Sequence, residues 1–222
     1  ELLQLAAVGL LDGGLRGLLV VLADRLLLEH QLDVLLGDRR ATLGGVALQV
    51  LEEGPAGAAH VDPAVLAAQS NEILTAVIQG ARKEETSPEV QLAALRALLN
   101  SLEFVRLNFE REGERNFIMQ VVCEATQSPH VAVKVAAFEN LVRIMQLYYD
   151  KMRFYMEQAL FGLTVLGMRD PEPHVALQAV EFWSTVCDEE IELSLEAAEA
   201  LEFNEEPTHV SYHFAQIALP EI

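Results

Sequence analysis

Apolar residues recur along this chain in a short phrase with helical spacing. The phrase occurs five times, and consecutive copies start 43, 44, 43 and 42 residues apart. The copies are Leu3–Val8, Val46–Leu51, Val90–Leu95, Val133–Phe138 and Val175–Val180. A period in this range is typical of two-helix repeats that stack into a solenoid and present a long binding surface. The pattern therefore predicts a binding protein rather than an enzyme with one catalytic pocket.

The third copy shows how one helix of each repeat is built. Its apolar positions follow the i, i+3, i+4, i+7, i+8 spacing of a buried helix face, at Val90, Ala93, Ala94, Ala97 and Leu98. A second apolar stripe follows on another side, at Leu92, Leu95 and Leu99. A helix that is apolar on two sides is expected to lie between neighbouring helices, and the small Ala pair lets those neighbours approach closely.

A partner helix precedes each of these segments. We predict partner helices at residues 73–81, 117–125 and 160–168, with an earlier one near 28–36 and a later one at about 209–219. Turn signals introduce the helices, at Asp62-Pro63, Ser87-Pro88, Ser128-Pro129, Asp170-Pro171 and Pro207-Thr208. No stretch alternates apolar and polar residues with the period of a strand. We expect an all-α superhelical solenoid over 1–222, with about four complete helix pairs and a half repeat at each end.

The charge balance narrows the choice of partners. The chain has 15 basic and 34 acidic residues, a formal net charge of −19, and no Lys or Arg follows Arg169. Such a balance disfavours nucleic acid and anionic membranes and favours basic partners. The acidic C-terminal stretch is either a solvated face or a docking surface for a basic segment. The apolar run 15–28 is interrupted by charges and is too short to span a bilayer.

Few residues offer reactive chemistry. Cys123 and Cys187 lie in apolar helical segments without metal or disulfide spacing, which predicts buried, reduced thiols and suits the cytosol or nucleus. His209 and His213 stand four residues apart, as a helical metal pair could, but no third ligand accompanies them. No nucleophile elbow or phosphate-binding loop is present. We therefore expect no enzyme, no metal and no cofactor.

Longer stretches carry a specific resemblance. Residues 70–85, 99–104, 113–126 and 180–190 closely resemble the importin-beta family of nuclear import receptors, the karyopherins. The resemblance covers about 62–222 and implies HEAT repeats, the fourth to seventh of that family. Residues 1–61 keep the period but match poorly. The usual basic position of a HEAT repeat is occupied by Gln91, Lys134 and Ala176, a departure from the pattern. Because the chain begins at Glu1 and ends within a helical pattern, we expect it to be part of a longer protein.

The resemblance implies partners and site residues. Members of the family bind phenylalanine-glycine (FG) nucleoporins between outer helices, load basic cargo proteins through the basic arm of importin-alpha, and release them to Ran-GTP. They move between cytoplasm and nucleus through the nuclear pore. The main nucleoporin cleft would be lined by Leu74, Thr75, Ile78, Glu114, Phe117 and Ile118, with Tyr155 in a neighbouring cleft. Glu181 and Asp188, near Trp183, would meet the importin-alpha arm.

The residues by themselves leave alternatives open. Leu74 and Ile78 form a stripe distinct from Ile73 and Val77, so one stripe can border a groove while the other packs inward. Both stripes can equally pack against adjacent repeats. Glu181 and Asp188 can belong to a solvated face. A HEAT-repeat scaffold without a transport role, such as a phosphatase scaffold subunit, or another karyopherin would share the period.

Overall fold

The computed structural model describes residues 74–102 and 105–221 of the chain. They lie in the second of two compact units, Leu74–Ile222. Several predictions made above fall outside the described residues. These are the first two copies of the repeated phrase, the partner helix near 28–36, the turn signal at 62–63 and the apolar run 15–28.

Within the described residues the structure is helical and contains no strand. A first helix covers 74–81. It is followed by α5 (Pro88–Ser101), α6 (Arg106–Glu110), α7 (Glu112–Ala125), α8 (Val131–Tyr148), the 3-10 helix η2 (Tyr149–Lys151), α9 (Arg153–Tyr155), the π-helix η3 (Met156–Leu160), α10 (Phe161–Met168), α11 (Pro173–Glu202) and α12 (Phe214–Ala218). The predicted all-α class is confirmed.

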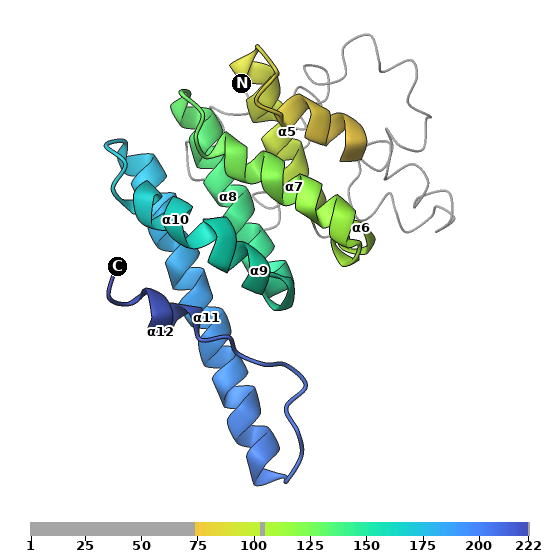
Figure 1. Ribbon diagram of the computed structural model, residues 1–222, viewed down its shortest axis with the longest axis vertical. Helices are drawn as coiled ribbons and strands as arrows, with labels where there is room; N and C mark the ends of the chain where they lie inside the picture. The colour runs from red at the N-terminus through yellow and green to blue at the C-terminus, as the bar shows by residue number, and fades with distance from the viewer. Residues whose placement is uncertain (1–73, 103–104, 222) are drawn as a thin grey trace, which may run out of the picture. The chain divides into compact units, whose positions relative to one another are not determined.

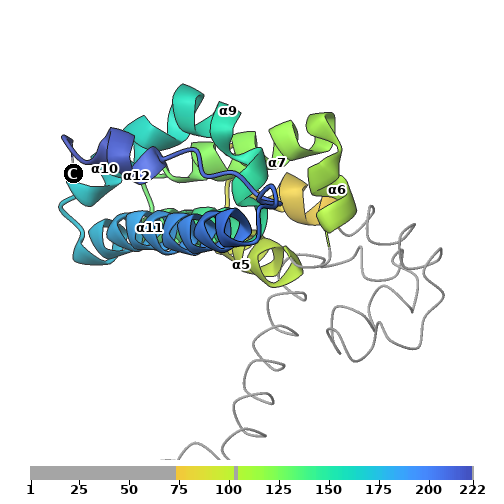
Figure 2. The same cartoon turned by 90° about the horizontal axis from the view of Figure 1, so that it is seen from below.

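The helices form two layers. Layer B contains α5, α8 and α11, and layer A contains helix 74–81, α7, the segment from α9 to α10, and α12 (Figures 1 and 2). Helix α8 packs against α5 and α11 within its layer and against α7 across the layers. Helix 74–81, α7 and the segment from α9 to α10 are each followed in sequence by a layer B partner, α5, α8 and α11 respectively. This is the helix–turn–helix unit that the repeated phrase predicts.

Two of the predicted turn signals act through side-chain oxygens. The Ser87 Oγ accepts a hydrogen bond from the Val90 backbone N–H at 3.3 Å, and Pro88 occupies the first helical turn of α5, where its missing N–H is harmless. Asp170 Oδ1 accepts from the Glu172 N–H at 3.0 Å ahead of α11. These local contacts explain why the chain leaves one helix and enters the next at these positions.

The core follows the predicted stripes. Ala93, Ala94, Ala97 and Leu98 are buried, as is Leu95 from the second stripe. Adjacent repeats are also joined by polar contacts across the core. Asn140 Nδ2 donates to the Leu95 carbonyl at 2.9 Å, and the Tyr148 hydroxyl donates to the Leu102 carbonyl at 2.5 Å. Each of these contacts links α8 to the preceding repeat and so fixes the stacking.

An ion pair joins the next two repeats. Lys134 Nζ lies 2.6 Å from Asp170 Oδ2, which places the basic residue just inside α8 beside the acid that precedes α11. The hydrogen bond from Lys134, followed by that from the Glu172 backbone, lowers the pKa of Asp170. Of the three residues at the usual basic position, Lys134 is the one that carries a positive charge, and it pairs with the acid ahead of the next layer B helix.

Two predictions made from the sequence are wrong. The helix expected at about 209–219 begins only at Phe214. The backbone N–H groups of Thr208 and His209 donate instead to the Glu196 carboxylate of α11, and that of Tyr212 donates to the Tyr149 hydroxyl. Cys187 is exposed rather than buried, since it lies on the side of α11 that faces away from α8 and α10. Cys123 is partly buried, and this burial raises the pKa of its thiol to about 12.

Candidate binding site

The residues of the predicted main cleft lie on helix 74–81 and on α7. These two helices are neighbours in layer A, as both views show (Figures 1 and 2). Just after the first helix, Lys83 Nζ lies 3.2 Å from Glu124 Oε1 near the end of α7, which ties the two helices together. The structure thus brings the two halves of the predicted cleft side by side.

The exposure of these residues differs from the expectation. Leu74, Ile78 and Ile118 are exposed by only 7%, 2% and 2%, and Val77 by 2%. The described members of the two apolar stripes, Leu74 and Ile78 on one and Val77 on the other, are therefore buried, and Ile78 does not form an exposed groove wall. The apolar side chains of this helix at Leu74, Val77 and Ile78 are therefore not exposed to solvent.

Three residues of the predicted cleft remain within reach of a ligand. Phe117 is 43% exposed, Thr75 is exposed, and Glu114 is partly exposed. The Glu114 carboxylate accepts hydrogen bonds from Asn108 Nδ2 at 2.6 Å and Arg111 Nη1 at 2.9 Å. The Arg111 hydrogen bond is the main cause of the lowered pKa of Glu114. The cleft itself stays a prediction, and Phe117 is its best exposed apolar residue.

Tyr155 joins the next pair of layer A helices. Its ring is buried, its hydroxyl donates to Asn116 Oδ1, and it accepts from Arg115 Nε at 3.1 Å. Because Arg115 and Asn116 belong to α7, this residue fixes α9 against α7. Tyr155 therefore lies between two layer A segments, and its place in a neighbouring cleft stays a prediction.

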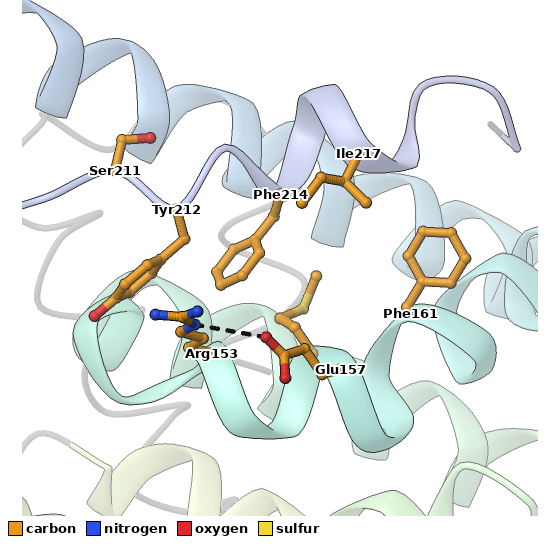
Figure 3. Close-up of a pocket in the computed structure, with 8 residues that line it drawn as sticks. Arg153, Glu157, Phe161, Ser211, Tyr212, Phe214 and Ile217 are labelled. Carbon is orange, nitrogen blue, oxygen red and sulfur yellow. Dashed lines mark hydrogen bonds and ion pairs between the residues drawn. The ribbon is translucent and has the colours of Figure 1, made fainter.

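A further cavity of the described residues lies along layer A. A cavity of about 490 Å³ opens between the segment from α9 to α10 and the chain that leads into α12 (Figure 3). Its lining residues are Arg153, Met156, Glu157, Phe161, Ser211, Tyr212, Phe214 and Ile217. Pockets for small ligands usually measure about 300–1,000 Å³ and are mostly apolar with a few polar groups. This cavity has that size and character.

The charged groups of the cavity stand on the wall formed by α9 and η3 (Figure 3). Arg153 Nε lies 3.5 Å from Glu157 Oε1, and the Arg153 guanidinium lies 5.7 Å from the centre of the Tyr212 ring (Figure 3). Tyr212 and Phe214 have ring centroids 5.4 Å apart. The cavity therefore combines aromatic rings and a thioether with a charged edge, which suits an apolar side chain carried on a polar backbone.

Sequence reasoning missed this cavity. Its two walls come from segments at least 50 residues apart, and neither wall matches a motif. The available signal was the gathering of Tyr212, Phe214 and Ile217 shortly after the polar stretch 204–209. The π-helical turn η3, which carries Met156 and Glu157, is a second feature that sequence did not predict, and such turns are frequent at functional sites.

The predicted arm-binding residues lie on α11. Glu181 and Asp188 are both exposed, whereas Trp183 is buried and packs edge-on against Phe161 and Phe182. Trp183 thus belongs to the core beneath the acidic face rather than to the face. Burial, and then repulsion from Glu192 and Asp188, raises the pKa of Glu189. The carboxylates on this side of α11 are close enough to repel one another.

His209 and His213, whose spacing would suit a helical pair, do not lie together on a helix. His209 Nδ1 lies 3.0 Å from Glu196 Oε2, and His213 precedes α12 with a left-handed backbone. Across residues 74–102 and 105–221, the acidic, His and Cys side chains form no group able to hold a metal ion. The described part of the chain contains no helix with the length and apolarity needed to cross a membrane.

Comparison with curated proteins decides the family. The chain matches no family model. It is 62% identical over 162 residues to importin subunit beta-1 of Schizosaccharomyces pombe, covering 73% of this chain and 19% of that protein. It is 51% identical over 157 residues to importin subunit beta-1 of Saccharomyces cerevisiae, covering 71% of this chain and 18% of that protein. The chain belongs to the importin-beta family. It spans about a fifth of the length of these relatives.

Solved structures agree with this assignment. An importin-beta crystal structure from ammonium sulfate aligns with a TM-score of 0.66 at 51% identity, over 73% of this chain and 19% of that one. A Kap95:Nup1 complex aligns with a TM-score of 0.65 at 49% identity, over 72% and 18% of the two chains. A further structure concerns Kap95p, whose binding induces the switch loops of RanGDP to adopt the GTP-bound conformation. It aligns with a TM-score of 0.63 at 50% identity, over 69% of this chain and 17% of that one. The two layers of helices are therefore importin-beta HEAT repeats.

Proposed function

We propose that this chain is part of a nuclear import receptor that binds FG nucleoporins between the helices of layer A. In this proposal the receptor carries basic cargo through importin-alpha and is controlled by Ran-GTP. It works in the cytoplasm, the nucleus and the nuclear pore. Related chains have been solved with Nup1 and with Ran, which supports these partner classes. The observation that carries the proposal is the cavity of about 490 Å³ between successive helices of layer A.

The cavity suits a phenylalanine side chain. Phe161, Tyr212 and Phe214 can contact an inserted ring, and Arg153 and Glu157 stand beside the polar backbone that would follow it. Full burial of a Phe side chain contributes about 1.5–3 kcal/mol. Single contacts of this strength exchange quickly, and several contacts on one nucleoporin strengthen each other through effective concentration. Phe117 offers a second contact point on α7.

A charge placed in the cavity tests the proposal. Ile217 lines the cavity and is 65% exposed, so Ile217→Asp leaves a hydrated carboxylate when the cavity is empty. An inserted ring would have to desolvate that charge, and we expect about 10- to 100-fold weaker binding of an FG-repeat peptide. Ile191→Asp is the matched control, because Ile191 is 58% exposed on α11 and does not line the cavity. Equal binding by both variants and the unmodified chain, in isothermal titration, would contradict the cavity as an FG site.

The predicted main cleft has its own test. Phe117→Ala removes an exposed ring, so the fold should persist while the peptide loses one contact, with affinity falling about threefold to tenfold. Phe203→Ala, which removes a 75% exposed ring at the end of α11, is the control. Ile78→Asp is less informative, since a carboxylate at this buried position threatens the fold as well as the cleft. Unchanged affinity of Phe117→Ala would remove α7 from the proposed site.

We also propose that the acidic face of α11 contributes to capture of the basic importin-alpha arm. Glu181 and Asp188 are exposed, and no Lys or Arg follows Arg169 to neutralise the surrounding acids. Exposed charges steer association and are screened over about 8 Å at physiological salt. The double variant Glu181→Lys with Asp188→Lys should slow association of an arm peptide several-fold and flatten its salt dependence. Stopped-flow association rates at two salt concentrations measure this, and unchanged rates would refute the assignment.

A further inference from the structure

One wall of the cavity is carried by a segment with little packing of its own. Residues 203–213, which we call the strap, leave the end of α11 and run back beside it to α12 (Figure 1). Residues 203–210 of the strap are exposed throughout. Four lining residues of the cavity, Ser211, Tyr212, Phe214 and Ile217, belong to the strap or to α12. The shape of the cavity therefore depends on what holds this segment in place.

The main anchor is a buried carboxylate. Glu190 of α11 is 8% exposed, and its Oε1 accepts hydrogen bonds from the Phe214 backbone N–H at 2.5 Å and the Tyr149 hydroxyl at 2.7 Å. Its Oε2 accepts from the Ala215 N–H at 3.2 Å. The Tyr149 hydroxyl in turn accepts from the Tyr212 N–H at 2.9 Å. One carboxylate thus holds the backbone at Phe214 and Ala215 directly, and at Tyr212 through Tyr149.

A second anchor lies closer to the solvent. Glu196 Oε1 accepts from the backbone N–H groups of Thr208 at 3.0 Å and His209 at 3.3 Å, and its Oε2 contacts His209 Nδ1. These groups are exposed, and exposed ion pairs contribute little. Hydrogen bonds to a buried charge are stronger, and leaving that charge without donors is costly. Glu190 is therefore the anchor that matters most.

The backbone at His213 fits this interpretation. His213 has a φ of 56°, in the left-handed region that residues other than glycine rarely adopt. The turn directs the next two N–H groups, those of Phe214 and Ala215, toward the two oxygens of Glu190. An unfavourable backbone conformation persists where surrounding contacts compensate for it.

We propose that Glu190 is a positioning residue, whose buried carboxylate fixes the strap-borne wall and thereby sets how tightly the cavity holds a phenylalanine side chain. This inference rests on the proposed function for the ligand. Two variants remove the anchor by different routes. Glu190→Gln keeps the size of the side chain but loses one acceptor and the charge. Tyr149→Phe keeps the ring and removes the hydroxyl that links Glu190 to Tyr212.

Amide hydrogen exchange on the full chain tests the anchor. Both variants should exchange at least about tenfold faster at Phe214 and at Tyr212, while α5 and α8 keep their protection. Glu189→Gln is the matched control, because no hydrogen bond is observed from Glu189 to another described residue and the net charge changes equally. Unchanged exchange in both variants, or equal acceleration throughout the chain, would overturn the positioning role.

Peptide binding tests the consequence. With Phe117→Ala as background, binding of a peptide with one Phe-Gly pair should weaken about threefold to tenfold in Glu190→Gln and Tyr149→Phe, and should not change in Glu189→Gln. Faster strap exchange with unchanged affinity would overturn the link between the strap and the cavity. If the unmodified chain fails to bind the peptide, the proposed function and this link both fall, while the exchange data still decide whether Glu190 anchors the strap.

Discussion

Asn140→Asp should lower the free energy of unfolding by about 3–5 kcal/mol, the largest effect that we expect of any single substitution in the described residues. Asn140 is fully buried in α8, and its Nδ2 donates to the carbonyls of Leu95 at 2.9 Å and Ala136 at 2.8 Å. The substitution keeps the size of the side chain. It replaces the donor with an oxygen that faces two carbonyl oxygens, so a buried charge is left without any donor.

The site offers no compensation for that charge. The side-chain oxygen of Asn140, Oδ1, has no hydrogen-bond partner among the described residues, so no donor stands ready for the carboxylate. Thermal and urea unfolding measure the effect. Asn100→Asp is the matched control, because Asn100 is exposed on α5, and surface substitutions usually change stability by less than about 0.5 kcal/mol. Similar stability of both variants would show that the Asn140 site is open to water.

The effect of Asn140→Asp should depend on pH. Burial raises the folded-state pKa of the introduced carboxyl above its unfolded value of about 3.9, so the folded state holds this proton more tightly. The destabilisation is complete above the folded pKa and shrinks as the pH falls through that pKa toward about 3.9. The difference in free energy of unfolding between the variant and the unmodified chain should therefore be smaller at pH 5 than at pH 8. A difference in unfolding free energy that grows as the pH falls would contradict this account.

Two glycines of α10 should respond to Ala in opposite directions. A Cβ added at Gly167 would lie 2.5 Å from Phe138 Cζ and 3.0 Å from Ala179 Cβ. Phe138 and Ala179 are fully buried in α8 and α11, so neither can move aside freely. Overpacking of this kind costs about 1–3 kcal/mol, which exceeds the gain of up to about 1 kcal/mol in helix propensity. Gly167→Ala should therefore destabilise the chain.

Gly162→Ala provides the internal comparison. Nothing lies within 4 Å of a Cβ added at Gly162, so only the gain in helix propensity remains. We expect a stabilisation of about 0.5–1 kcal/mol, which raises the melting temperature by about 2–4 °C. Calorimetry of the two variants shows directly whether each substitution raises or lowers the stability of the chain. Stabilisation by both substitutions would mean that α10 can move away from α8 and α11, and destabilisation by both would mean that the helix tolerates no side chain there.

The sequence alone determined the class of structure and its family. Periodic apolar positions such as Ala93, Ala94 and Leu98 must be buried because their spacing matches one helix face, and proline and capping side chains such as Ser87 stop and start helices locally. Long stretches of specific residues also identified the family, which the comparisons confirm. These features are readable because each depends on residues close together in the chain.

Only the tertiary structure decided which of these residues a partner can reach. Ile78 and Phe117 look alike as apolar helix positions, yet one is 2% and the other 43% exposed, because neighbouring helices cover the first and not the second. The cavity and its Glu190 anchor join residues distant in sequence, from Tyr149 to Phe214. Exposure and pocket shape depend on how repeats stack, and spacing within one helix carries no record of what the next repeat covers.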